Sequence, residues 1–110
     1  MGLSKTEKFT THQNELAIMS KALGHPARIA ILEYLLKANN CICGDIVGEL
    51  GLAQATVSQH LKELKNLGII KGSIEGTSTC YCIDSEKWES ISEAFSRFFG
   101  QRAACSDACC

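Results

Sequence analysis

Residues 54–67 read QATVSQHLKELKNL and carry the clearest helical pattern of the sequence. Val57, Leu61 and Leu64 recur at the i, i+4 and i+7 spacing of one helix face, and Leu67 extends that stripe. Gly68 follows at the position where glycine commonly ends a helix. The pattern therefore predicts an amphipathic helix with one buried and one polar face.

The segments on either side complete a recognisable arrangement. Residues 42–51, ICGDIVGELG, predict a shorter helix, and the turn at 51–53 joins it to the helix at 54–67. Two helices joined by a short turn that contains glycine indicate a helix-turn-helix. The β-prone runs at 69–74 and 79–84 surround a turn with Gly76 and predict a hairpin, which would form a wing.

The remaining segments predict helices at both ends. An apolar pattern in residues 1–22 predicts a first helix with a frayed start. Gly24-His25-Pro26 interrupts it, and ARIAILEYLLKANN (27–40) predicts a buried helix in which Ile29, Ile31, Leu32, Leu35 and Leu36 form the stripe. A last helix is expected over 85–100. The fold class is thus mainly α with a small β-hairpin, a winged helix-turn-helix in the order α-α-α-α-β-β-α.

Length and composition agree with one small domain. The chain has 110 residues, one proline and a formal net charge of −1. We expect the winged domain to span 1–101, with a cysteine-containing tail at 102–110. Apolar runs are far shorter than a membrane span, and the start lacks a signal peptide, so a soluble, cytoplasmic protein with no membrane partner is expected.

The last helix carries four of the chain's seven aromatic side chains. Its inward positions are expected at Trp88, Ile91, Ala94, Phe95, Phe98 and Phe99. A monomer this small has little for such a stripe to cover. We therefore expect a homodimer interface shared with the first helix; the alternative is that the rings complete the monomer core.

The polar face of the helix at 54–67 suits a DNA major groove. Glutamine can pair with adenine, serine and threonine suit bases or phosphates, and lysine supplies positive charge. The expected DNA contacts are Gln54, Thr56, Ser58, Gln59, His60 and Lys62, with Thr77 and Ser78 at the wing tip touching the backbone. The alternative is an ordinary solvated face, and a net charge of −1 permits DNA binding without requiring it.

Two stretches resemble one known family. Residues 22–32, ALGHPARIAIL, and residues 52–64, LAQATVSQHLKEL, are similar to the ArsR/SmtB family of metal-responsive repressors. The resemblance implies a homodimer on a palindromic operator that leaves when an inducer binds. Ala53 departs from the serine that many members carry as a helix cap. His60, by the same resemblance, is expected to pack or to contact a phosphate rather than to bind metal.

Seven cysteines lie in three clusters. Cys41-Ile-Cys43-Gly-Asp45 resembles the element that arsenite- and cadmium-responsive members carry at the start of the helix before the recognition helix. A helix N-terminus lowers thiol pKa values, and soft ions select sulfur. The family's third cysteine is replaced here by Ile46 or Val47, so the match is incomplete.

The other two clusters are candidates for further ligands. Cys80 and Cys82 alternate along a strand and would face one side of the sheet. The tail trio Cys105, Cys109 and Cys110 resembles the C-terminal arsenite site of some ArsR-type repressors. As(III) is the first expected inducer, ahead of Sb(III), Cd(II) or Pb(II), and no organic cofactor is expected. A last helix with Asp84 and no histidine disfavours the zinc site of the SmtB branch.

Other functions remain open at this point. In the same fold, paired cysteines could instead respond to oxidants or persulfides. A small enzyme, a thiol oxidoreductase or arsenate reductase, is disfavoured because the chain has no Cys-x-x-Cys and no phosphate-binding glycine loop. A metal-buffering protein would not need a helix-turn-helix.

Overall fold

The computed structural model describes residues 8–38, 42–43, 47–73 and 80–102. The elements follow in the order α1 (Thr11–Ala22), α2 (Pro26–Ala38), β1 (Ile42–Cys43), α3 (Val47–Leu50), α4 (Gln54–Asn66), β2 (Ile70–Ser73), β3 (Cys80–Ile83) and α5 (Ser85–Phe99). This is the winged helix-turn-helix that the sequence predicts, with a short extra strand between α2 and α3.

Local side-chain chemistry explains where the helices begin. Thr10 starts α1 with a capping box, in which its side chain accepts from the Gln13 amide and the Gln13 side chain accepts from the Thr10 amide. The Asp84 side chain accepts from the Lys87 amide and starts α5. Ala53, in contrast, starts α4 without a side-chain cap.

The sheet has three strands in the order β1-β3-β2, and both pairings are antiparallel. In β1, Ile42 pairs with Tyr81 and Cys43 pairs with Cys80. The prediction of a helix throughout 42–51 was therefore wrong for residues 42 and 43. Their backbone groups pair with β3, about forty positions later in the chain, and no local pattern encodes that partner.

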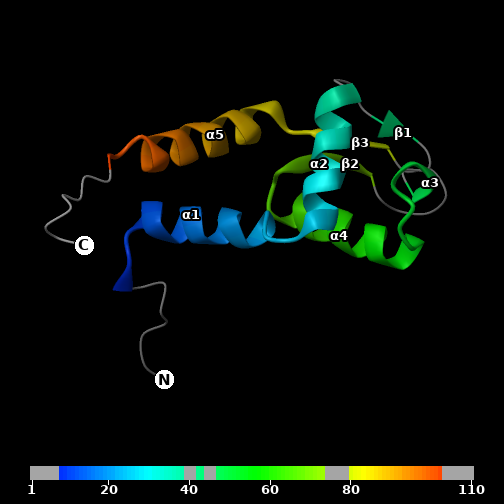
Figure 1. The fold of residues 1–110 in the computed structure, drawn as a ribbon, viewed down its shortest axis with the longest axis horizontal. Helices are drawn as coiled ribbons and strands as arrows, with labels where there is room; N and C mark the ends of the chain where they lie inside the picture. Colours follow the sequence, from blue (N-terminus) through cyan, green and yellow to red (C-terminus); the bar gives the residue numbers. More distant parts are fainter. Residues whose placement is uncertain (1–7, 39–41, 44–46, 74–79, 103–110) are drawn as a thin grey trace, which may run out of the picture.

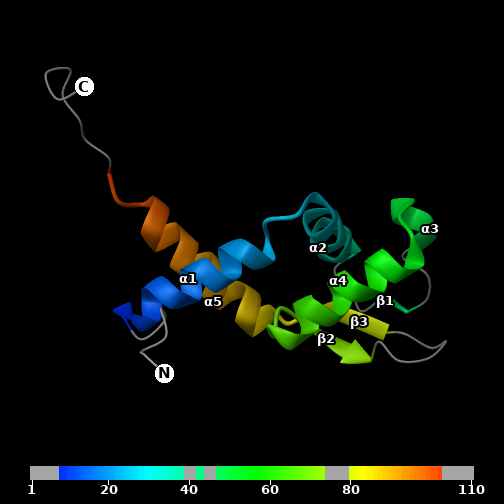
Figure 2. The same cartoon turned by 90° about the horizontal axis from the view of Figure 1, so that it is seen from below.

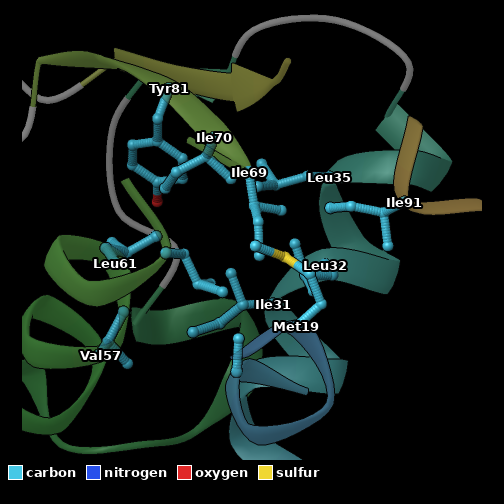
Figure 3. Packing of buried hydrophobic residues seen from close by; sticks show 12 residues of the cluster. Met19, Ile31, Leu32, Leu35, Val57, Leu61, Ile69, Ile70, Tyr81 and Ile91 are labelled. Atoms are coloured by element: carbon cyan, nitrogen blue, oxygen red, sulfur yellow. The ribbon is translucent and has the colours of Figure 1, made fainter. Parts of the chain in front are cut away.

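The core forms where α1, α2, α4, α5 and the sheet meet (Figure 3). Ile31, Leu64 and Ile69 are completely buried, and Tyr81 from β3 reaches the same cluster. Val57, Leu61 and Leu64 form the buried stripe of α4, as its spacing predicts. This stripe fixes the rotation of α4 and so decides which of its side chains face outward.

Two predicted core residues of α2 lie outside the core. Ile29 is 40% exposed and Leu36 is 41% exposed, whereas Ala27, Ile31, Leu32 and Leu35 are buried. Ile29 and Leu36 are seven positions apart, so they share a face opposite the i, i+4 series of 27, 31 and 35. The expected stripe was too broad for the single core face that α2 has.

Helices α1 and α5 lie side by side and lead away from α4 and the sheet (Figures 1 and 2). Lys87 of α5 approaches Glu15 of α1 at 3.9 Å. In the described ranges, every helix is too short or too polar to cross a membrane. The chain thus separates into a helix pair at one end and a helix-turn-helix with its sheet at the other.

Candidate nucleic-acid interface and thiol site

The outward face of α4 carries most of the side chains expected to contact DNA. Gln54, Thr56, Gln59 and Lys62 are exposed, and Ser58 at the flank is half-buried. The buried stripe on the opposite side holds this face outward. The helix therefore presents amide, hydroxyl and ammonium groups together, which are the groups that bind base edges and phosphates.

A side-chain network anchors this face to α2. Gln59 Nε2 donates to Glu63 Oε1 at 3.1 Å, one turn further along α4. Glu63 in turn forms an ion pair with Arg28 of α2. Gln59 is therefore held by a carboxylate that is itself held by a second helix. Sequence reasoning missed Arg28 and Glu63 as a pair because the two residues are 35 positions apart.

His60 lies behind the DNA-facing surface. It is 8% exposed, its Nδ1 accepts from Arg28 Nε at 2.9 Å, and its ring lies 4.5 Å from that of His25. Burial lowers the pKa of His60, and the positive charges of His25 and Arg28 lower it further. The neutral ring can accept from Arg28, so this geometry supports the packing role and not a phosphate contact.

The charge around α4 is more favourable to DNA binding than the net charge of −1 for the whole chain indicates. Lys62, Lys65 and Lys71 are exposed on α4 and β2. Glu63 is the acidic residue among them, and its ion pair with Arg28 offsets its charge. Acidic residues are concentrated instead on α5, at Glu86, Glu89 and Glu93. Figure 1 shows that most of α5 lies beside α1, away from α4.

The wing begins with a close contact between its strands. Gly72 has φ 129°, and a Cβ added there would lie 2.0 Å from the carbonyl oxygen of Cys80. A side chain at this position would collide with the β3 backbone. The expected wing-tip contacts Thr77 and Ser78 lie outside the described residues.

The strands bring two of the cysteine clusters together. Cys43 of β1 is the register partner of Cys80 of β3. Tyr81 is buried while Cys80 and Cys82 are half-buried, which fits the expected placement of these two cysteines on one face. Cys43 lies in a strand, so the predicted position of this residue at the start of a helix was wrong.

Four further thiols belong to the predicted metal sites. Cys41, Cys105, Cys109 and Cys110 lie outside the described residues. Among the residues that the structure does describe, no group of three or more His, Cys, Asp or Glu side chains could hold a metal ion. Asp84, which a zinc site on the last helix would need, caps α5 instead.

Sequence comparisons connect this architecture to known regulators. A family model described as "Bacterial regulatory protein, arsR family" matches residues 25–71. An uncharacterized HTH-type transcriptional regulator of Methanocaldococcus jannaschii is 40% identical over 72 residues, which cover 64% of this chain and 80% of that protein. A cadmium resistance transcriptional regulatory protein CadC homolog of Staphylococcus aureus is 34% identical over 107 residues, which cover 94% of this chain and 86% of that protein.

Solved structures share the fold. HlyU from Vibrio cholerae superposes with a TM-score of 0.63 at 26% identity, over 84% of this chain and all of that one. NolR from Sinorhizobium fredii superposes with a TM-score of 0.61 at 24% identity, over 93% of this chain and 99% of that one. Both solved proteins thus share the overall fold of this chain.

Proposed function

The chain belongs to the ArsR family of bacterial regulatory proteins, and from that premise we propose that it is a homodimeric repressor that releases its operator when its thiols bind As(III). The family and the fold are those of DNA-binding transcription regulators and not of enzymes. The observation that carries the proposal is the exposed polar face of α4, held outward by a buried apolar stripe.

DNA contact is proposed for two regions. Helix α4 enters the major groove, where its side chains meet bases and phosphates. The wing tip, which includes Thr77 and Ser78, touches the neighbouring backbone. The proposed groove contacts are Gln54, Thr56, Ser58, Gln59 and Lys62.

Two substitutions separate base contact from phosphate contact. Gln59→Ala should relax sequence preference, because an amide that pairs with a base is lost. Lys62→Ala should weaken binding to all sequences and reduce the salt slope by about one unit. Lys21→Ala is the matched control, since Lys21 is an exposed lysine on α1 and is not one of the proposed groove contacts. If Gln59→Ala leaves discrimination between operator and random DNA unchanged, the proposed orientation of α4 is wrong.

The homodimer is proposed at α1 and α5. Residues of the two helices line a groove of about 300 Å³: Gln13, Leu16, Ala17, Ser20, Phe95, Phe98 and Phe99. Phe98 is 49% exposed and Phe99 is 74% exposed, which counts against rings that merely complete a monomer core. Apolar area of this kind gains stability when a second copy covers it.

Sedimentation velocity tests the dimer. The double variant Phe98→Ser/Phe99→Ser should dissociate to monomers at concentrations where the parent protein is dimeric. The variant Ile29→Ser/Leu36→Ser serves as the control, because it removes two exposed apolar side chains from α2 instead. Equal dissociation of both variants would place the interface elsewhere.

The proposed inducer follows from the thiol inventory. Soft ions select thiolates over oxygen ligands, which favours As(III), with Sb(III) or Cd(II) as further candidates. Cys41 and Cys43 are the first proposed ligands, and β1 directly precedes α3 of the helix-turn-helix. Cys80 and Cys82 are a second source, favoured by the register of β1 and β3. The tail trio Cys105, Cys109 and Cys110 is a third.

Fluorescence anisotropy on promoter DNA tests both inducer and site. Reduced, anaerobic protein should leave the DNA when arsenite is added in amounts equal to the thiol sites. Cys41→Ser/Cys43→Ser should still bind DNA and lose this response, whereas serine at all three tail positions should leave it intact. Release only by a persulfide donor or oxidant would favour a redox-responsive repressor in place of a metalloid sensor.

A further inference from the structure

Two strands place a pair of cysteines opposite one another. Cys43 of β1 and Cys80 of β3 are direct register partners in an antiparallel pair. Directly opposed residues in such a pair have Cβ atoms about 4.5–5.5 Å apart, and disulfides join Cβ atoms about 3.5–4.5 Å apart. A small approach of the two strands would therefore bring the Cβ atoms to the distance that a disulfide needs. The register therefore makes Cys43 a suitable bonding partner for Cys80.

A second observation concerns the state of Cys80 itself. Cys80 is disulfide-bonded. It is half-buried, whereas its neighbour Tyr81 is 1% exposed and faces the core. Its side chain thus lies on the side of the sheet away from that core, where small thiols and disulfides can reach it.

We propose that Cys43 and Cys80 form a reversible cross-strand disulfide, a modification site that links the segment before α3 to the wing. Disulfides in cytoplasmic proteins are typically transient and sense redox state. The bond joins a strand that leads into the helix-turn-helix to the central strand of the sheet.

The oxidant is a low-molecular-weight disulfide such as glutathione disulfide. The thiolate of Cys80 attacks one sulfur of the oxidant, forms a mixed disulfide and releases one thiolate. The thiolate of Cys43 then attacks the Cys80 sulfur, forms the protein disulfide and releases the second thiolate. The two protein thiols lose two electrons to the oxidant, and their two protons end on the two released thiols.

The bond also regulates the thiol site, and this consequence rests on the proposed function. Sulfurs joined to each other no longer act as thiolates, so Cys43 and Cys80 cannot bind As(III) in the oxidised form. The oxidised repressor should therefore remain on DNA when arsenite is added. Reduction should restore release.

Peptide mapping of the full-length protein tests the bond directly. Reduced protein is oxidised with glutathione disulfide under native conditions, alkylated and digested with trypsin. Cleavage after Lys37, Lys62, Lys71 and Lys87 gives peptide 38–62, with Cys41 and Cys43, and peptide 72–87, with Cys80 and Cys82. The expected product is a disulfide-linked pair of these two peptides, with fragment ions that place the bond between Cys43 and Cys80.

Matched double variants provide the control. Cys41→Ser/Cys82→Ser keeps the register pair and should form the linked peptides at the parental yield. Cys43→Ser/Cys80→Ser keeps the other two cysteines and should reduce that yield about tenfold or more. Linkage at parental yield in the second variant, or fragment ions that place the parental bond elsewhere, would overturn the proposal. The fragment ions of the parent protein decide the matter even if a variant fails to fold.

A DNA-binding measurement distinguishes this proposal from the proposed function. The linked peptides form without arsenite or DNA, so their absence refutes the disulfide alone. Arsenite that fails to release the reduced protein refutes the metalloid response alone. If the disulfide forms and arsenite releases the reduced protein, the oxidised protein should stay on DNA when arsenite is added. A phosphine reductant should then restore release by arsenite, and it adds no competing thiol.

Discussion

Replacing Arg28 with methionine removes one guanidinium that joins three parts of the chain. Its Nε donates to His60 Nδ1 at 2.9 Å, its Nη1 donates to the Ala22 carbonyl oxygen at 3.3 Å, and its Nη2 pairs with Glu63. Methionine keeps much of the aliphatic length of arginine. The substitution therefore tests the polar contacts more than the packing.

The three contacts contribute unequally. His60 is 8% exposed, and a buried acceptor that loses its donor costs about 1–3 kcal/mol. The Glu63 side chain is 39% exposed, so its ion pair adds about 0.2–1 kcal/mol. The long bond to Ala22 adds about 0.5 kcal/mol. We expect Arg28→Met to lower the free energy of unfolding by about 2–4 kcal/mol.

Urea unfolding followed by circular dichroism measures this loss. The protein concentration is held fixed, because the stability of a dimer depends on it. Lys21→Met is the control: it removes an exposed charge on α1 and should change stability by less than about 0.5 kcal/mol. A loss below about 1 kcal/mol for Arg28→Met would refute the reasoning, because His60 would then have a replacement partner.

Three further predictions concern His60, the start of α4 and the glycines with positive φ. Because burial, together with His25 and Arg28, lowers the pKa of His60, the unfolded chain binds a proton below about pH 6.5 more readily than the folded chain. The free energy of unfolding should be greatest above pH 6.5 and fall as the pH drops toward the pKa of His60 in the folded protein. The variant His60→Asn keeps a hydrogen-bond acceptor but cannot take up this proton. Its urea midpoint should therefore change less between pH 7.5 and 5.5 than that of the parent protein. Ala53→Ser should raise the free energy of unfolding by about 1 kcal/mol through the missing cap of α4, and an unchanged urea midpoint would contradict this. Gly72→Ala should lower the free energy of unfolding by about 3 kcal/mol or more, because the added Cβ would collide with the β3 backbone. Gly51→Ala is the control: Gly51 also has a positive φ, but no atom lies within 4 Å of the added Cβ, so the cost should be about 1 kcal/mol.

The sequence predicts the elements whose signals are local. The stripe of α4 and the glycine after it place that helix within a residue, and Gly24-His25-Pro26 correctly separates α1 from α2. Strand β1 escapes prediction because two residues have no period of their own and depend on a partner far along the chain. The exposure of Ile29 and Leu36 likewise depends on which side of α2 the rest of the fold covers.

In the candidate site, too, some residues can be predicted from local sequence patterns and others depend on contacts between distant segments. The polar face of α4 follows from helical spacing alone, so its residues can be named from the sequence. The network of Arg28, His60 and Glu63 joins α2 to α4, and only the packing of the two helices reveals it. The cysteine clusters are visible in the sequence, but the pairing of Cys43 with Cys80 needs the strand register.

Strand β1 has a further consequence for the behaviour of the protein in concentrated solution. It covers one edge of β3, the central strand, whose sequence CYCI is apolar and β-prone. Open edges of such strands pair readily with other chains and begin aggregation. A variant that detaches β1 should therefore precipitate while its helices are still folded. By covering this edge, Ile42 and Cys43 help to keep the protein in solution.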